Sequence, residues 1–298
     1  MKYVVTGGAG FIGSNLVNKL IEQGHEVHVI DNFKFGKREN CNSCATYHEL
    51  DISNINKLDN FKKIILGADT VFHVAAVARV QPSIKNPIEY EKNNTLGLVN
   101  ILKAAVDTDV RRFVYSSSSS VYGNTVKLPL NEKAPTKPIS PYGAQKLYGE
   151  ILCKTFSSVY NIQTVSLRYF NVYGENQNIG GAYSLVIGIF INQKLNNLPL
   201  TIRGDGEQKR DFTYVGDVVR ANILASESSN VGKGESINIG RGDNVSINDI
   251  ARTIGGEKTY IDSVLEPKET LADNNKAKKL LGWEPKMNVI DWLKSQEL

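Results

Sequence analysis

The sequence predicts an α/β protein: a doubly wound, parallel Rossmann sheet with a smaller, intertwined C-terminal substrate domain. Two observations carry this prediction. Apolar runs of strand length alternate with stretches of helical periodicity through the first half of the chain, a pattern typical of a parallel sheet covered by helices. A glycine-rich segment, residues 6–13 (TGGAGFIG), separates the first such run from the first helical stretch.

The expected elements follow one another closely along the chain. Residues 3–5 form the first strand, and the helix after the glycines keeps apolar residues at helical spacing until Gly24 ends it. Further strands are expected at residues 26–31, 46–51, 70–76, 111–116 and 162–169, with helices near 53–65, 85–106 and 141–160. No internal repeat or low-complexity linker interrupts this order.

Composition limits the classes of partner. The 298 residues include 35 basic and 31 acidic side chains, a net charge of +4, which is too even a balance to indicate nucleic-acid binding. No apolar run approaches the ~18 residues of a membrane span, and the chain starts with a strand rather than a signal peptide. We expect a cytoplasmic protein that binds neither nucleic acid nor membrane.

The cysteines do not indicate a metal site. Cys41 and Cys44 have the spacing of half a zinc site or of a redox pair, but no second Cys or His pair lies at metal-ligand spacing. They also lie between strands rather than at the start of a helix. We therefore expect no bound metal, and free thiols in a polar loop are the alternative to a functional role.

The glycine segment fits the dinucleotide fingerprint Gly8-x-Gly10-x-x-Gly13. Glycines at these positions allow a tight turn and let backbone amides approach a pyrophosphate at a helix N-terminus. Asp31 ends the second strand, where a carboxylate can hold the ribose hydroxyls and repel a 2′-phosphate. This favours NAD, although the nearby basic residues Lys34, Lys37 and Arg38 leave NADP open.

A tyrosine and a lysine four residues apart, Tyr142 and Lys146, are the strongest candidates for chemistry. A phenol has an ordinary pKa of about 10, and a fixed ammonium group one helical turn away would favour the phenolate. Five consecutive serines, residues 116–120, follow the central strand, and ligands of such folds bind at that edge of the sheet. A general base with a neighbouring hydroxyl is therefore expected there.

On these residues the chain resembles an extended short-chain dehydrogenase/reductase, and within that superfamily the nucleotide-sugar 4-epimerases acting on UDP-glucose or UDP-N-acetylglucosamine. The motifs that carry the resemblance are residues 6–13, 72–76 (FHVAA), 93–94 (NN), 115–123 (YSSSSSVYG), Tyr142 with Lys146, 168–174 (RYFNVYG), 204–212 (GDGEQKRDF), 215–217 (VGD) and 272–283 (ADNNKAKKLLGW). It implies an NAD-binding domain of residues 1–169 plus about 215–240, and a nucleotide-sugar-binding domain of about 170–214 and 241–298.

The resemblance also implies the residues of the site. Tyr142 acts as general base and acid, Lys146 contacts the nicotinamide ribose and lowers the tyrosine pKa, and Ser118, or a serine beside it, binds the sugar 4-oxygen. Cofactor contacts are expected from Gly7, Gly10, Phe11, Ile12, Asp31, Asn32, Asp51, Ile52, Ala75, Ala76, Asn93, Ser116, Tyr142, Lys146 and Tyr169. Substrate contacts are expected from Ser118, Asn171, Arg210, Glu266 and Thr270. For Asp51 a helix cap is an equal alternative.

Two positions bear on the substrate. Relatives carry an arginine for the diphosphate where this chain has Ser263, so Lys268 or another base compensates or the diphosphate is held differently. Thr270 is at a position where a large aromatic side chain restricts similar epimerases to plain hexoses. A threonine there implies room for N-acetylhexosamines as well as hexoses.

The implied reaction inverts C4 of a UDP-hexose or UDP-N-acetylhexosamine through a transient 4-keto sugar, with tightly bound NAD. One alternative is a 4,6-dehydratase or decarboxylase. Dehydratases have an Asp-Glu pair after the serine run, however, where this chain has Ser119 and Ser120. The second alternative is a non-catalytic dinucleotide sensor. Such proteins often lose the Tyr or the Lys, and this chain has both. Helices near 90–106 and 141–160 imply a homodimer by the same resemblance, although their apolar faces could equally cover the sheet.

Overall fold

The computed structural model describes residues 1–125, 127–180, 184–264 and 266–296. Its centre is a seven-stranded sheet in the order β11-β6-β5-β4-β1-β2-β3, and every pairing within it is parallel. The strands are β1 (Lys2–Thr6), β2 (Glu26–Asp31), β3 (Thr46–Glu49), β4 (Thr70–His73), β5 (Arg112–Ser118), β6 (Gln163–Tyr169) and β11 (Lys233–Ile239). The prediction of a doubly wound parallel sheet is confirmed.

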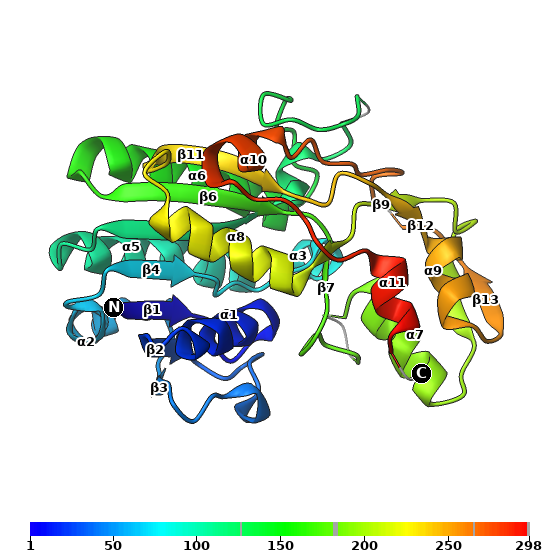
Figure 1. Ribbon diagram of the computed structural model, residues 1–298, viewed down its shortest axis with the longest axis horizontal. Coiled ribbons are helices and arrows are strands. Elements are labelled where there is room, and N and C mark those ends of the chain that lie inside the picture. Colours follow the sequence, from blue (N-terminus) through cyan, green and yellow to red (C-terminus); the bar gives the residue numbers. More distant parts are fainter. Residues whose placement is uncertain (126, 181–183, 265, 297–298) are drawn as a thin grey trace.

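Helices cover both faces of this sheet (Figure 1). On one face α1 (Phe11–Glu22), α8 (Val215–Glu227) and α10 (Asn275–Leu281) share a hydrophobic core with the strands. On the other face α2 (Leu58–Ile65), α5 (Gly97–Asp107) and α6 (Pro141–Tyr160) form a second core. Because both faces of the central strands are buried, β1 and β4 read as near-continuous apolar runs rather than as alternating patterns.

A smaller lobe lies beyond the carboxyl ends of the strands (Figure 1). Its helices are α7 (Val186–Leu195), α9 (Ile247–Ile254) and α11 (Val289–Lys294). They pack around a third core that includes Phe190, Ile250 and Trp292. The chain segments of this lobe also form three two-stranded sheets. They are β7 (Val172–Tyr173) with β10 (Thr213–Tyr214), β8 (Leu200–Arg203) with β13 (Lys258–Ile261), and β9 (Lys209–Arg210) with β12 (Val245–Ser246).

Most expected elements are confirmed with small differences at their ends, such as β5, which continues to Ser118, and α2, which begins at Leu58. Two differ more strongly. The strand expected over residues 70–76 ends at His73, because its neighbour β1 ends opposite it at Thr6 and the chain then turns beneath the glycine loop. The helix expected over 85–106 is divided into α3 (Val80–Lys85), α4 (Pro87–Glu91), a π-helical turn (Lys92–Leu96) and α5. Pro87 begins α4, and a residue before proline avoids helical geometry.

The helix that carries the Tyr/Lys pair was predicted with its observed bounds, residues 141–160. Ser140 caps it by accepting a hydrogen bond from the Gly143 N–H at 3.1 Å, and Pro141 occupies the first helical position, where its missing N–H costs nothing. Asn161 ends it in the left-handed conformation. Short 3₁₀ turns at Arg38–Asn40, Ile55–Lys57 and Ser119–Tyr122 complete the helical segments.

The described residues contain neither a membrane-spanning helix nor a cluster of metal ligands. None of the helices there combines the length and the apolar character that crossing a bilayer requires. The same part of the chain holds no group of three or more His, Cys, Asp or Glu side chains arranged around a metal ion. All three cysteines are free: Cys41 is half-buried, Cys44 exposed and Cys153 buried in the second core.

Candidate active site

A cavity of about 820 Å³ lies at the carboxyl ends of the strands, between the sheet and the small lobe. One end is walled by the glycine loop and the other by the serine run and the head of α6. Most of the expected site residues line it. These are Gly7, Gly10, Phe11, Ile12, Asp31, Asn32, Ile52, Ala75, Ala76, Asn93, Ser118, Tyr142, Tyr169, Asn171, Arg210, Glu266 and Thr270.

The glycine loop is built by close backbone contacts that leave no space for side chains. A Cβ on Gly13 would lie 2.1 Å from the Gly7 carbonyl oxygen. Gly7 itself has a φ of +72°, and a Cβ there would lie 2.7 Å from the Ala75 Cα. Backbone atoms therefore form the cavity wall at the N-terminus of α1, which is the cradle that a dinucleotide pyrophosphate requires.

Asp31 lies beside this cradle at the end of β2. Its carboxylate accepts hydrogen bonds from the Ala9 N–H at 3.0 Å and from the Phe33 N–H at 2.8 Å. Burial raises the pKa of Asp31, and these two backbone donors oppose the shift. Each carboxylate oxygen has a second lone pair for a ribose hydroxyl, so the position fits the expected NAD contact.

Tyr142 and Lys146 lie on the first turns of α6, at the opposite end of the cavity. Lys146 is buried at 3% exposure, and its ammonium nitrogen lies 5.8 Å from the Tyr142 ring centroid. It donates a hydrogen bond to the Ser116 carbonyl oxygen at 2.7 Å. Burial lowers the pKa of Lys146 to about 7. The ammonium group is thus fixed behind the tyrosine rather than on the cavity wall.

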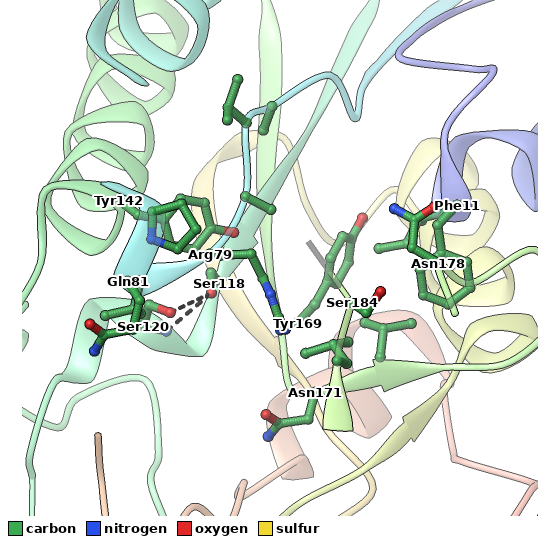
Figure 2. A pocket seen from close by; sticks show the side chains of 18 of the residues that line it. Phe11, Arg79, Gln81, Ser118, Ser120, Tyr142, Tyr169, Asn171, Asn178 and Ser184 are labelled. Carbon is green, nitrogen blue, oxygen red and sulfur yellow. Dashed lines mark hydrogen bonds between the residues drawn. The ribbon is translucent and has the colours of Figure 1, made fainter. Parts of the chain in front are cut away.

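The pKa of Tyr142 is raised, mainly by burial of the phenol. A hydrogen bond with Ser118 and the positive charge of Arg79 act in the opposite direction. Ser118 also accepts a hydrogen bond from the Ser120 N–H at 3.1 Å (Figure 2). Ser118 is therefore the serine of the run that contacts Tyr142, and the expected role of Lys146 in lowering the tyrosine pKa stays a prediction for the enzyme with its cofactor.

Three of the site residues expected from the sequence do not line the cavity. Asp51 is exposed, and its carboxylate accepts hydrogen bonds from the N–H and hydroxyl of Ser53 in a local turn. The following 3₁₀ turn is capped by Asn54 instead, so Asp51 is not a helix cap either. Ser116 lies behind the wall, where its hydroxyl bonds to that of Tyr169 at 3.0 Å. The third is Lys146, and neither Ser263 nor its expected substitute Lys268 lines the cavity.

The substrate-side residues come from segments far apart in the chain. The Asn171 amide donates to the Asp211 carbonyl oxygen at 3.0 Å and to the Thr270 hydroxyl at 3.3 Å. Arg210 forms an ion pair with Glu266 at 3.0 Å and donates to the Lys209 carbonyl oxygen at 2.9 Å. The expected substrate residues of the small lobe thus lie together, already bonded to one another or to the backbone.

Sequence reasoning missed two arginines of the cavity wall, Arg79 and Arg203. Arg203 ends β8, which pairs with β13 so that Arg203 lies opposite Ile261, and its guanidinium donates to the carbonyl oxygen of Asp262, the residue before Ser263, at 3.5 Å. It therefore places a guanidinium near the position where relatives were expected to carry one. No sequence motif predicts that β8 pairs with β13, and none predicts the direction of the Arg79 side chain. Both arginines therefore could not be assigned to the site from the sequence.

The glycine cradle, the doubly wound sheet and a Tyr/Lys pair at the head of the helix after the serine strand together define an extended short-chain dehydrogenase/reductase. Comparison with known proteins places the chain within this class. Residues 3–240 match the model of the NAD dependent epimerase/dehydratase family, and the chain belongs to that family.

Individual relatives align with this chain over nearly its whole length. The chain is 38% identical to a putative UDP-glucose 4-epimerase of Methanocaldococcus jannaschii over 98% of both proteins. It superposes with a TM-score of 0.94 on a UDP-glucose 4-epimerase of Thermotoga maritima solved with UDP-glucose, at 38% identity over 99% of this chain and 96% of that one.

A UDP-glucuronic acid 4-epimerase of Bacillus cereus, solved with UDP-glucuronic acid and NAD, gives a TM-score of 0.90 at 36% identity, covering 99% of this chain and 97% of that one. These comparisons confirm an isomerase of the UDP-sugar 4-epimerase type whose cofactor is NAD.

Proposed function

We propose that this isomerase inverts C4 of a UDP-hexose or UDP-N-acetylhexosamine through a transient 4-keto sugar. The observation that carries the proposal is the meeting of Tyr142, Ser118 and the glycine cradle on one continuous cavity. Relatives that are 38% and 36% identical were solved with UDP-glucose and with UDP-glucuronic acid, which supports a UDP-linked sugar as the substrate.

In the proposed reaction the chain's own residues handle the proton and hold the sugar. The Tyr142 phenolate takes the proton from the C4 hydroxyl and later returns it, while the Ser118 hydroxyl binds the same oxygen. Bound NAD would supply reversible hydride transfer at C4. Gly7, Gly10 and Asp31 would hold NAD, and buried Lys146 would keep positive charge behind the phenol.

The diphosphate would be held by arginines of the small lobe. Arg203 and Arg210 both line the cavity there, and a guanidinium matches the fork geometry of phosphate oxygens. Arg203 would take the role of the arginine that relatives carry at the position of Ser263. The sugar would then point toward Tyr142, and Thr270 would lie beside its C2 substituent.

We also propose a division into two domains, a homodimer and a cytoplasmic location. The division into an NAD-binding domain (1–169 plus about 215–240) and a sugar-binding domain is supported by α8 and β11, which pack on the central sheet. A homodimer is supported by apolar side chains exposed on α4 and α6, among them Ile88 and Ile151. A cytoplasmic location follows from the supply of NAD and nucleotide sugars there. Light scattering and cell fractionation test these two points.

The activity test uses purified protein with its bound NAD. It is incubated separately with UDP-glucose, UDP-N-acetylglucosamine, UDP-glucuronate and dTDP-glucose, and the products are identified by NMR. A C4 epimer from a UDP-sugar supports the proposal, whereas a 4-keto-6-deoxy product would assign the chain to the dehydratases. The absence of turnover with every sugar, despite bound NAD, would reject the proposal.

A further inference from the structure

Arg79 is the most unusual residue of the cavity wall. It lies in the loop between β4 and α3, with a φ of 98° and a ψ of 139°. Positive φ is uncommon for a residue with a side chain and is strained for an arginine. Figure 2 shows its side chain extending into the cavity, with Tyr142 and Ser118 on one side in this view and Tyr169 on the other.

The surrounding structure enforces this conformation. The buried Asn94 amide bonds to both the N–H and the carbonyl oxygen of Val77, at 2.8 and 2.9 Å. The Tyr90 hydroxyl donates to the carbonyl oxygen of Ala78 at 2.5 Å. The two residues before Arg79 are thus held from outside the loop. Strain kept in place by its surroundings is characteristic of ligand sites.

The guanidinium of Arg79 makes no hydrogen bond or ion pair with any residue that the structure describes, although it is only half-exposed. Burial lowers the pKa of Arg79, opposed by the nearby Tyr142, Tyr90 and Glu266. By contrast, Arg210 on the same cavity is paired with Glu266. A partly desolvated cation that lacks a partner is unfavourable unless an anion joins it.

We propose that Arg79 binds a carboxylate carried by the sugar ring, and so directs this enzyme toward anionic UDP-sugars rather than neutral ones. The inference rests on the proposed function, because it concerns the sugar that Tyr142 epimerises. A guanidinium with free N–H groups can hold a carboxylate through two parallel charge-assisted hydrogen bonds.

The position of Arg79 favours the sugar over the diphosphate as the source of the anion. Figure 2 shows the Arg79 side chain beside Tyr142 and Ser118, the two residues expected to act at the sugar 4-oxygen. Arg203 and Arg210 lie on the small-lobe part of the cavity wall, which suits the diphosphate. Arg79 therefore faces the end of the substrate on which the general base acts.

The test compares four UDP-sugars with the NAD-bound enzyme. UDP-glucose and UDP-N-acetylglucosamine are neutral at the sugar, UDP-glucuronate has a carboxylate on C5, and UDP-N-acetylmuramate has one on the C3 lactyl group. We expect kcat/KM to be higher for one of the carboxylate sugars than for both neutral ones. The preferred sugar identifies which carboxylate Arg79 binds.

Two variants separate charge from strain. Arg79→Met should lower kcat/KM for the preferred carboxylate sugar by roughly ten- to a hundredfold more than for the neutral sugars, because the loss of the positive charge near Tyr142 affects every sugar alike and only the carboxylate sugar also loses its partner. Arg79→Gly should have the same selective effect at equal or higher stability, because glycine adopts this φ without strain. Arg252→Met removes a charge from an exposed residue of α9 and serves as the control.

Three results would overturn the inference. One is a wild-type enzyme that epimerises neutral sugars best. Another is an equal loss with all four sugars and with UDP binding in Arg79→Met, which would assign Arg79 to the diphosphate. The third is an equal loss of kcat/KM with neutral and anionic sugars while UDP binding stays unchanged, which would make Arg79 only an activator of Tyr142. Failure of the proposed function looks different: no UDP-sugar would be epimerised at all.

Discussion

The two ends of the cavity are built on different principles. At the cofactor end, backbone atoms form the wall: Gly7 and Gly13 leave no space for a Cβ, and the N–H groups of Gly7 and Gly10 donate to main-chain carbonyl oxygens. At the sugar end, side chains from distant segments form it, as when Asn171 and Thr270 meet across 99 positions of the chain. The cofactor end tolerates little change, whereas single side chains can alter the sugar end.

The largest effect is expected from Gly13→Ala. Its Cβ would lie 2.1 Å from the Gly7 carbonyl oxygen and 2.9 Å from the Gly8 Cα, both main-chain atoms that cannot move aside. We expect the cradle to be distorted and bound NAD to fall below detection after purification, measured by absorbance of the extracted cofactor. Gly180→Ala is the control, since a Cβ there meets nothing within 4 Å. Stoichiometric NAD in Gly13→Ala would show that the backbone wall is less rigid than described.

Tyr142→Phe tests the sugar end with the cofactor end intact. Removal of one hydroxyl should reduce kcat by about 10²–10⁴-fold, the range for a general acid–base group, while the NAD content stays unchanged. The matched control is Tyr148→Phe, an exposed tyrosine on the same helix. Activity within tenfold of wild type would remove Tyr142 from the proton transfer.

The difference between the two ends also explains how much the sequence could predict. The cofactor end depends on local spacing, so the glycine fingerprint, Asp31 and the bounds of α6 could be predicted. The direction of Arg79 depends on Asn94 and Tyr90, which hold its loop from another segment. No spacing in the sequence carries that information.

The tyrosine pKa could not be predicted for a related reason. The sequence shows that Lys146 is one turn from Tyr142, but not how deeply the phenol is buried. Burial dominates the Tyr142 pKa in the structure, and Arg79 supplies the opposing charge. The division of the expected helix over 85–106 was predictable in principle, because Pro82 and Pro87 both lie within or beside it.

Glu150→Gln tests the buried ion pair between Glu150 and Arg168, which joins α6 to the central sheet. The Glu150 carboxylate pairs with the Arg168 guanidinium at 2.6 and 2.8 Å, each side chain 5% exposed, and accepts hydrogen bonds from Ser117 and Ser236. These partners join α6 to β5, β6 and β11. A glutamine would leave Arg168 as a buried, unpaired charge, a loss of about 3–5 kcal/mol, measured by denaturant unfolding.

The control for that loss is Glu22→Gln in the exposed pair with Lys19, with side-chain exposures of 63% and 51%. Exposed pairs contribute about 0–1 kcal/mol, so this variant should unfold close to wild type. If the two variants were equally stable, the pair of Glu150 and Arg168 would not be the structural base of the site.

The smallest effect is expected from Thr270→Tyr, which should narrow the sugar end without disturbing the cofactor end. The Thr270 hydroxyl accepts hydrogen bonds from the Asp211 N–H at 3.2 Å and from the Asn171 amide at 3.3 Å. A tyrosine loses this geometry and adds a ring to the cavity wall, so kcat/KM for N-acetylhexosamine substrates should fall about 10–200-fold relative to hexoses. Thr270→Ser, which keeps the hydroxyl, should leave the ratio unchanged. An unaltered ratio in Thr270→Tyr would place the C2 substituent elsewhere in the cavity and leave its selection to another side chain.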